Sequence, residues 1–151
     1  MPVIEDDAKC DCKLPPQLDA LLAFWREKTA GGFPKESDFD DGAMAPWRGN
    51  FALIDCEVGN GFRFRRCGAG LIRRLGREAT GSTVETLAGD VAAELHASLT
   101  RCAAGSVPVT ARASVAMGRR SRICYVDLVL PLAGADGRTA TLLFSSCKVV
   151  E

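Results

Sequence analysis

The chemistry that this sequence offers is concentrated in residues 62–81, FRFRRCGAGLIRRLGREATG, which hold six arginines and four glycines. Glycine-rich turns next to basic side chains can cradle phosphate groups. A dinucleotide-binding fingerprint would need glycine at positions 68, 70 and 73, but Arg73 occupies the third position. A phosphate-binding loop of the GxxxxGK type is also missing. The glycines therefore indicate a junction between a strand and a helix.

The arginines of this stretch divide into two geometric sets. Arg63 and Arg65 alternate with phenylalanines and share the outer face of an expected strand, whereas Arg73, Arg74 and Arg77 lie on the polar side of an expected short helix. They form either a solvated surface, balanced in part by acidic residues near the N-terminus, or a patch for an acidic partner protein. Because no Tyr or Trp is interleaved to stack on bases, nucleic-acid binding is disfavoured.

His96 is the single histidine of the chain. It lies at the edge of the apolar face of an expected long helix, a position typical of a partly exposed packing residue, and any nucleophile would have only this one base. Asp127 interrupts the apolar run ICYVDLVL and is either a solvated residue, the commoner case, or a buried carboxylate beside a pocket. We find no catalytic constellation and expect a protein that is not an enzyme.

The seven cysteines are odd in number, and most lie in apolar periodic segments, where free cysteine behaves as a small hydrophobic residue. Cys10 and Cys12 are the one close pair, and no second pair at zinc spacing exists. No signal peptide or long apolar span is found. These features predict reduced thiols, no metal and no membrane contact, and a cytoplasmic protein.

The chain has the size and composition of one globular domain, with 151 residues of which 47% are hydrophobic and 25% charged. Its formal net charge is zero, but residues 1–41 contain ten acids against five bases, a net charge of −5. The remaining residues carry nine acids against fourteen bases, a net charge of +5. The acidic N-terminal part either is solvated or docks on the basic body.

Residues 1–13 are polar and are expected to form a loose tail, and residues 14–49 are expected to form a helix and a connecting loop. Apolar residues recur at three- and four-residue spacing along the helix: Leu18, Leu21, Leu22 and Trp25. The loop has little periodicity, and four apolar side chains are expected to attach it to the body: Phe33, Phe39, Met44 and Trp47.

Residues 50–151 form the expected core domain. A hairpin is predicted at 50–58 and 61–67, because Gly59 and Asn60 tolerate the positive φ of a tight turn. The remaining elements are a short helix at 69–75, a long helix at 90–105, and strands at 107–117, 122–132 and 138–150. Tight turns make the last three strands antiparallel neighbours, so we predict an α+β domain whose five-stranded antiparallel sheet carries short helices and the longer helix on one face.

This order resembles that of a PAS domain. The segments LLAFWREKTAGGFPKESDFD and NFALIDCEVGNGFRFRRCGAGLIRRLGREATGSTVETL resemble short bacterial PAS-like proteins that share a helix with a Leu…Trp core, a P…SDFD loop, and a hairpin running into a Gly-led helix and a GR…TG turn. The resemblance covers about residues 18–150 and is most specific up to Gly81. It implies a sensor or protein-interaction module in signal transduction without an output domain of its own.

The resemblance also implies where such a protein would bind its ligand and partners. A small-molecule pocket would lie between the sheet and the crossing helices, and the residues expected there are Phe64, Leu71, Leu75, Leu95, His96, Leu99 and Tyr125. The helix that carries Leu18, Leu21, Leu22 and Trp25 would form a homodimer surface, and Arg73, Arg74 and Arg77 would bind signalling proteins. No cofactor is expected. The alternatives are a haem sensor with His96 as iron ligand, a nucleotide sensor and, more distantly, an enzyme.

Overall fold

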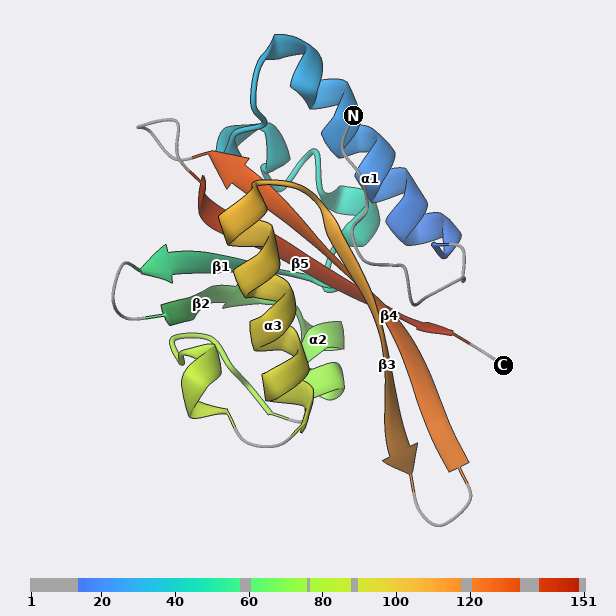
Figure 1. Ribbon diagram of the computed structural model, residues 1–151. Coiled ribbons are helices and arrows are strands. Elements are labelled where there is room, and N and C mark those ends of the chain that lie inside the picture. The colour runs from blue at the N-terminus through green and yellow to red at the C-terminus, as the bar shows by residue number, and fades with distance from the viewer. Residues whose placement is uncertain are drawn as a thin grey trace.

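Figure 1 shows the computed structural model, which describes residues 14–57, 61–75, 77–87, 90–117, 121–133 and 139–149. Five antiparallel strands form one sheet in the order β2-β1-β5-β4-β3. The strands are β1 (Phe51–Glu57), β2 (Gly61–Cys67), β3 (Val109–Met117), β4 (Ser121–Ala133) and β5 (Thr139–Val149). The predicted α+β class and five-stranded sheet are confirmed.

The helices are α1 (Pro16–Lys28), α2 (Ala69–Leu75) and α3 (Asp90–Gly105). The described residues also form short 3-10 turns, which are η2 (Thr29–Gly31), η3 (Glu36–Phe39), η4 (Ala45–Trp47) and η5 (Val84–Thr86). Each helix and strand falls close to its predicted range. The predicted turns at residues 58–60, 118–120 and 134–137, and the predicted tail at 1–13, lie outside the described residues. Within the described part, no helix has the length and hydropathy that crossing a membrane requires.

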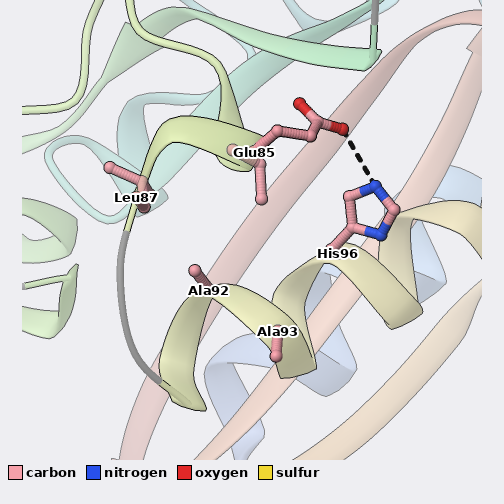
Figure 2. Close-up of a pocket in the computed structure, with 6 residues that line it drawn as sticks. Glu85, Leu87, Ala92, Ala93 and His96 are labelled. Atoms are coloured by element: carbon pink, nitrogen blue, oxygen red, sulfur yellow. Dashed lines mark ion pairs between the residues drawn. The ribbon is translucent and has the colours of Figure 1, made fainter.

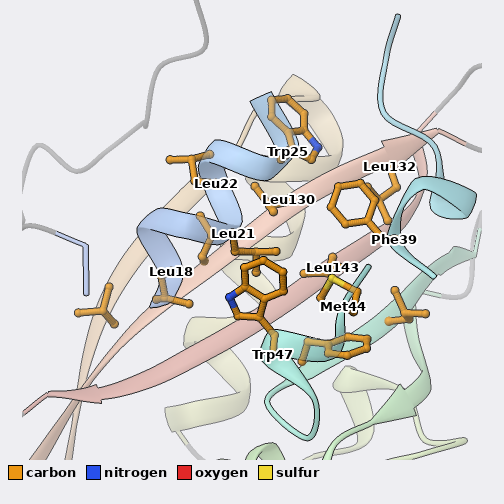
Figure 3. Packing of buried hydrophobic residues seen from close by; sticks show 14 residues of the cluster. Leu18, Leu21, Leu22, Trp25, Phe39, Met44, Trp47, Leu130, Leu132 and Leu143 are labelled. Atoms are coloured by element: carbon orange, nitrogen blue, oxygen red, sulfur yellow. The ribbon is translucent and has the colours of Figure 1, made fainter. Parts of the chain in front are cut away.

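One face of the sheet is covered by α1 and the η2–η4 segment (Figures 1 and 3). The indole of Trp25 donates a hydrogen bond of 2.9 Å to the carbonyl of Pro131 on β4, and the indole of Trp47 donates one of 2.8 Å to the carbonyl of Gln17. Two buried tryptophans thus fix α1 to the sheet and η4 to α1. The sheet side chains in this outer core are Phe51, Leu53, Val126, Leu128, Leu130, Leu132 and Leu143.

The four side chains predicted to form a homodimer surface on α1 are not available at the surface, and whether the protein dimerises stays a prediction. Leu18 and Leu21 are 0% exposed, Leu22 is 2% and Trp25 is 3% exposed, all within the core of their own chain. The prediction assumed that α1 has little core of its own to cover. The sheet, however, has a second apolar face, and covering that face removes more apolar surface from water than leaving it open. The predicted loop anchors Phe39, Met44 and Trp47 are buried beside α1, whereas Phe33 is 37% exposed and meets Trp25 edge-on, with 6.1 Å between the ring centres.

The opposite face of the sheet carries α2, η5 and α3 (Figure 1). Leu71 of α2, Leu95, Leu99 and Cys102 of α3, and Val84 of η5 pack here on sheet side chains. The sheet contributes Ala52, Ile54, Phe62, Phe64, Val109, Val129, Leu142 and Phe144 to this inner core. The alternation predicted for β2 is confirmed, because Phe62 and Phe64 point into this core and Arg63 and Arg65 point to the other face.

The glycines after β2 allow two backbone segments to touch. The amide of Gly70 donates a hydrogen bond of 2.7 Å to the carbonyl of Gly49, and the amide of Gly68 donates one of 3.0 Å to Phe51. A Cβ atom at Gly70 would lie 2.9 Å from the Gly49 carbonyl oxygen, and one at Gly68 would lie closer still. These positions exclude a side chain for reasons of packing. The glycine pattern is therefore structural, as the missing third glycine indicated.

Truncating Leu21 to alanine should lower the free energy of unfolding by about 2–5 kcal/mol, because it leaves a cavity in the outer core. Chemical denaturation followed by tryptophan fluorescence measures the change. Arg26→Ala on the exposed side of the same helix is the control and should shift stability by less than about 0.5 kcal/mol. Equal small effects in both variants would show that α1 is not part of the core.

Candidate functional site

An open groove of about 420 Å³ lies between η5 and the first turns of α3 (Figure 2). Its walls are largely apolar, and its polar groups are the carboxylate of Glu85 and the imidazole of His96. The lining residues are Val84, Glu85, Leu87, Ala92, Ala93 and His96. A mostly apolar concavity with a few convergent polar groups is the usual form of a small-molecule site.

Glu85 joins the three elements that meet at the groove. One carboxylate oxygen, Oε1, accepts a hydrogen bond of 3.3 Å from the amide of Phe62 at the start of β2. The other, Oε2, lies 2.9 Å from Nε2 of His96 on α3, as Figure 2 shows. Glu85 itself belongs to η5. A single carboxylate therefore holds η5, β2 and α3 together at the rim of the inner core.

Phe62 and Gly61 shape the surroundings of this carboxylate. The ring of Phe62 meets the imidazole of His96 edge-on, with 5.4 Å between the ring centres. Gly61 has φ of 84°, and a Cβ atom there would overlap the Glu85 carboxylate. The side chains of Glu85 and His96 are 38% and 45% exposed, so water and small solutes reach both. The pair is accessible enough for a ligand to compete for it.

Of the seven residues predicted to line a pocket, His96 lines the groove. Phe64, Leu71 and Leu99 are 0% exposed and Leu95 is 4% exposed, so these four fill the inner core, and Leu75 packs against its edge. Tyr125 lies on β4 opposite Ala113 and Lys148 and belongs to neither core cluster. Whether any of the seven binds a ligand stays a prediction. The space beneath α3, where the pocket was predicted, is filled by the side chains of Phe64, Leu71, Leu95 and Leu99.

Sequence reasoning missed Val84, Glu85, Leu87, Ala92 and Ala93. The small residues at positions 92 and 93 are the one sequence signal that could have found the groove, because they leave space beside the helix. The approach of Glu85 to His96 joins η5 to α3, and no local sequence pattern encodes a contact between two separate elements.

His96 does not fit the role of a haem ligand in this arrangement. Its Nε2 atom is engaged by Glu85, and the space behind it is filled by Leu95, Leu99 and Phe62. Within the described ranges, no group of three or more His, Cys, Asp or Glu residues could hold a metal ion. Cys10 and Cys12 lie outside those ranges.

The thiols of the inner core are poor nucleophiles. Burial raises the pKa of Cys56 to about 11, with a smaller contribution from the carboxylate of Asp55. Burial also raises the pKa values of Cys67 and Cys102. A raised thiol pKa leaves almost no thiolate at neutral pH, so these residues are suited to packing rather than covalent catalysis.

All three arginines of residues 62–66 are paired with acids. Arg63 contacts Glu57 at 3.1 Å, and Arg66 contacts Asp41 at 2.8 Å. Arg65 binds Asp55 at 2.5 Å and also Glu36, and these hydrogen bonds, Asp55 first, raise its pKa. Acids from the N-terminal part of the chain thus neutralise basic residues of the sheet, as one of the two sequence interpretations proposed.

The structure describes the side chains of two of the three arginines that were predicted to bind a partner protein. Arg73 and Arg77 are exposed. The side chain of Arg74 lies outside the described part. Their role in binding a partner stays a prediction.

Asp127 is buried, not solvated as the commoner interpretation had it. It is 5% exposed and accepts a hydrogen bond of 2.5 Å from the hydroxyl of Ser146, the residue opposite it on β5. Asp127 and Ser146 lie two residues from Val129 and Phe144, so they share the inner face of the sheet. The hydroxyl of Ser146 thus provides a hydrogen-bond donor to the buried carboxylate of Asp127.

No protein-family model and no curated protein sequence matches the chain. Solved structures do match. A light-oxygen-voltage domain studied with a flavin analogue has a TM-score of 0.54 at 16% identity, over 73% of this chain and 84% of that one. The PAS domain of BvgS from Bordetella pertussis has a TM-score of 0.53 at 21% identity, over 68% and 79%. VqmA from Vibrio cholerae, described as a LuxR-type receptor, has a TM-score of 0.53 at 11% identity, over 67% and 46%.

The sheet order, the helices on the inner face and these likenesses together define the fold: the chain has a PAS-like fold. The predicted resemblance is confirmed at this level. At such identities the likeness is one of fold, and the chemistry of the groove has to be argued from this chain's own residues.

Gly61→Ala should displace the Glu85 carboxylate and break its contact with His96, because the new Cβ atom would overlap the carboxylate. The side-chain resonances of His96 and the amide of Phe62 should shift in NMR spectra. Gly81→Ala is a matched control, because Gly81 also has a positive φ, 87°, but a Cβ atom there would meet nothing within 4 Å. Both variants should lose about 1–3 kcal/mol to backbone strain. Identical His96 shifts in both would contradict the described contact.

Proposed function

We propose that this protein is a sensory module that binds a small molecule in the groove between η5 and α3. The observation that carries the proposal is the placement of Glu85 and His96. These two polar side chains interact with each other and converge in an otherwise apolar groove on the face of the PAS-like sheet that carries α2, η5 and α3. The volume of about 420 Å³ is within the range of small-molecule sites. The fold supports a role in signal transduction by analogy only.

The lining indicates the class of ligand. Val84, Leu87 and Ala92 offer apolar contacts, and the imidazole of His96 and the carboxylate of Glu85 offer hydrogen bonds at one side. Such a site suits a compact, mainly apolar molecule with one polar or weakly charged group. Because the inner core behind the groove is filled, the ligand would bind at the rim and not beneath α3.

The signal would be a change in how η5, β2 and α3 are held together. A ligand whose polar group binds His96 would compete with Glu85, whose other oxygen accepts the Phe62 amide. Loss of this carboxylate contact would favour conformations in which η5 separates from α3. Such a ligand shifts the equilibrium by the difference between its affinities for the two states. A partner protein that contacts η5 or β2 would detect the shift.

We further propose that the protein acts without catalysis and in a reducing compartment. His96 is the single histidine, and burial raises the pKa values of Cys56, Cys67 and Cys102, which disfavours nucleophilic chemistry. The cysteines of the described residues form no disulfide bond with one another, as is usual for proteins of a reducing compartment. A haem or nucleotide sensor is the less favoured alternative, because Nε2 of His96 is engaged and the glycines of residues 68–70 serve packing.

Filling the groove tests the proposal. Native mass spectrometry of purified protein should detect a small molecule on the wild type, and Ala93→Phe should remove it, because position 93 lines the groove. Ala97→Phe is the control: Ala97 is exposed on the same helix and does not line the groove. The expected result is occupancy in the wild type and the control, and at least about tenfold less in Ala93→Phe, since a phenyl ring occupies the volume that the ligand needs.

A small molecule that remains bound to Ala93→Phe would place the ligand site elsewhere. Failure to bind any molecule, both on purification and in a screen of small apolar acids, amides and alcohols, would contradict the sensory proposal.

A further inference from the structure

A second open cleft, of about 430 Å³, lies where α1, η4 and α2 meet, away from η5 and α3. It is a mainly polar cleft, and the residues that matter to its chemistry are Gln17, Trp47, Arg48, Asn50, Gly70 and Arg73. Its cationic groups are the guanidinium groups of Arg48, at the end of η4, and Arg73, on α2. The backbone contact of Gly70 with Gly49 fixes these two elements to each other.

Arg48 and Arg73 differ from the arginines of β2. Arg63, Arg65 and Arg66 each contact an acid, whereas the side chains of Arg48 and Arg73 have no acidic partner within the described ranges. A smaller hollow that also contains Arg48 is lined by Arg66 together with its partner Asp41, so those two charges offset each other. The positive charge of the cleft therefore comes from Arg48 and Arg73, and guanidinium groups bind carboxylates well.

We propose that this cleft binds the chain's own N-terminal segment, residues 1–13. The segment reaches Leu14 directly, and Gln17 on the first turn of α1 lines the cleft, so the segment joins the body beside the two arginines. It contains Glu5, Asp6, Asp7 and Asp11 against two lysines. An extended chain covers up to about 3.4 Å per residue, so Asp7 can lie as far as roughly 24 Å from Leu14. Gln17, three residues from Leu14, lines the cleft, so the cleft begins close to the point from which the segment extends.

The rest of the acidic N-terminal part supports this assignment. Residues 1–41 have a net charge of −5 and the remaining residues +5. Glu36 and Asp41 of this part already contact Arg65 and Arg66 of the body. Binding of residues 5–7 and Asp11 to Arg48 and Arg73 continues the same charge pairing along the surface. An acidic partner protein that binds the cleft would have to displace this segment, which makes the segment a built-in competitor.

Photo-crosslinking in the full chain tests the proposal. A benzoylphenylalanine at position 8 should crosslink, within the same chain, to residues 46–50 or 69–73, as mapped by mass spectrometry. Replacing Glu5, Asp6, Asp7 and Asp11 by their amides should reduce this yield about threefold or more, the scale expected when several exposed charge pairs are lost. Added salt should reduce the yield in the same direction, because it screens exposed charges.

Arg48→Gln with Arg73→Gln should reduce the yield equally, and Arg26→Gln, an exposed arginine at the other end of α1, should leave it unchanged. Mixing ¹⁴N- and ¹⁵N-labelled protein separates crosslinks within a chain from those between chains. Crosslinks between chains would overturn the proposal in favour of exchange with a second copy. Crosslinks to other residues would also overturn it, and so would a crosslinking yield that stays the same after the four amide substitutions. These substitutions lie in residues 1–13 and replace no residue of the folded body. The result is independent of ligand binding in the groove.

Discussion

The sheet of this protein is apolar on both faces, and the rest of the structure follows from the need to cover both. β4 shows this most clearly, because Leu128 and Leu130 point into the outer core and Val129 points into the inner core. An antiparallel sheet can leave one face in water only if that face is polar. Here α1 and the η2–η4 segment cover one face and α2, η5 and α3 the other. The two indole hydrogen bonds of Trp25 and Trp47 give the outer layer a fixed position on the sheet.

This double coverage determines where small molecules and partners can bind. The inner core is filled by Phe64, Leu71 and Leu99, so space remains only at its rim, where the small residues Ala92 and Ala93 leave a groove beside α3. The carboxylate of Glu85 lies at that rim and holds η5, β2 and α3 together. On the other side of the molecule, α1 is no longer available as a free helix, and the connection from η4 to β1 brings Arg48 next to α2.

The sequence was sufficient to predict the helices and strands. It was insufficient to predict which side chains of distant segments contact each other. Periodicity placed α3 and the hairpin of β1 and β2 because these patterns are local, and the glycines at positions 68 and 70 lie at the junction of strand and helix that the sequence predicted. The apolar run of residues 123–132 already indicated burial on both faces, which would have assigned α1 to the core. The pairing of Glu85 with His96, and of Asp127 with Ser146, depends on long-range approach of segments, which no spacing rule encodes. The pocket residues were carried over from the resemblance, and in this chain the side chains of Phe64, Leu71, Leu95 and Leu99 are packed in the core at that place.

Hydrogen exchange measured at two protein concentrations tests the central claim, that the chain covers both faces of its own sheet. The account predicts that the amides of α1 are protected about as strongly as those of β4 and β5, because α1 opens only when the core opens. This protection should be the same in dilute and concentrated protein. Fast exchange along α1 in dilute protein, with protection that appears only as concentration rises, would contradict the account and would show that α1 covers a second copy of the chain.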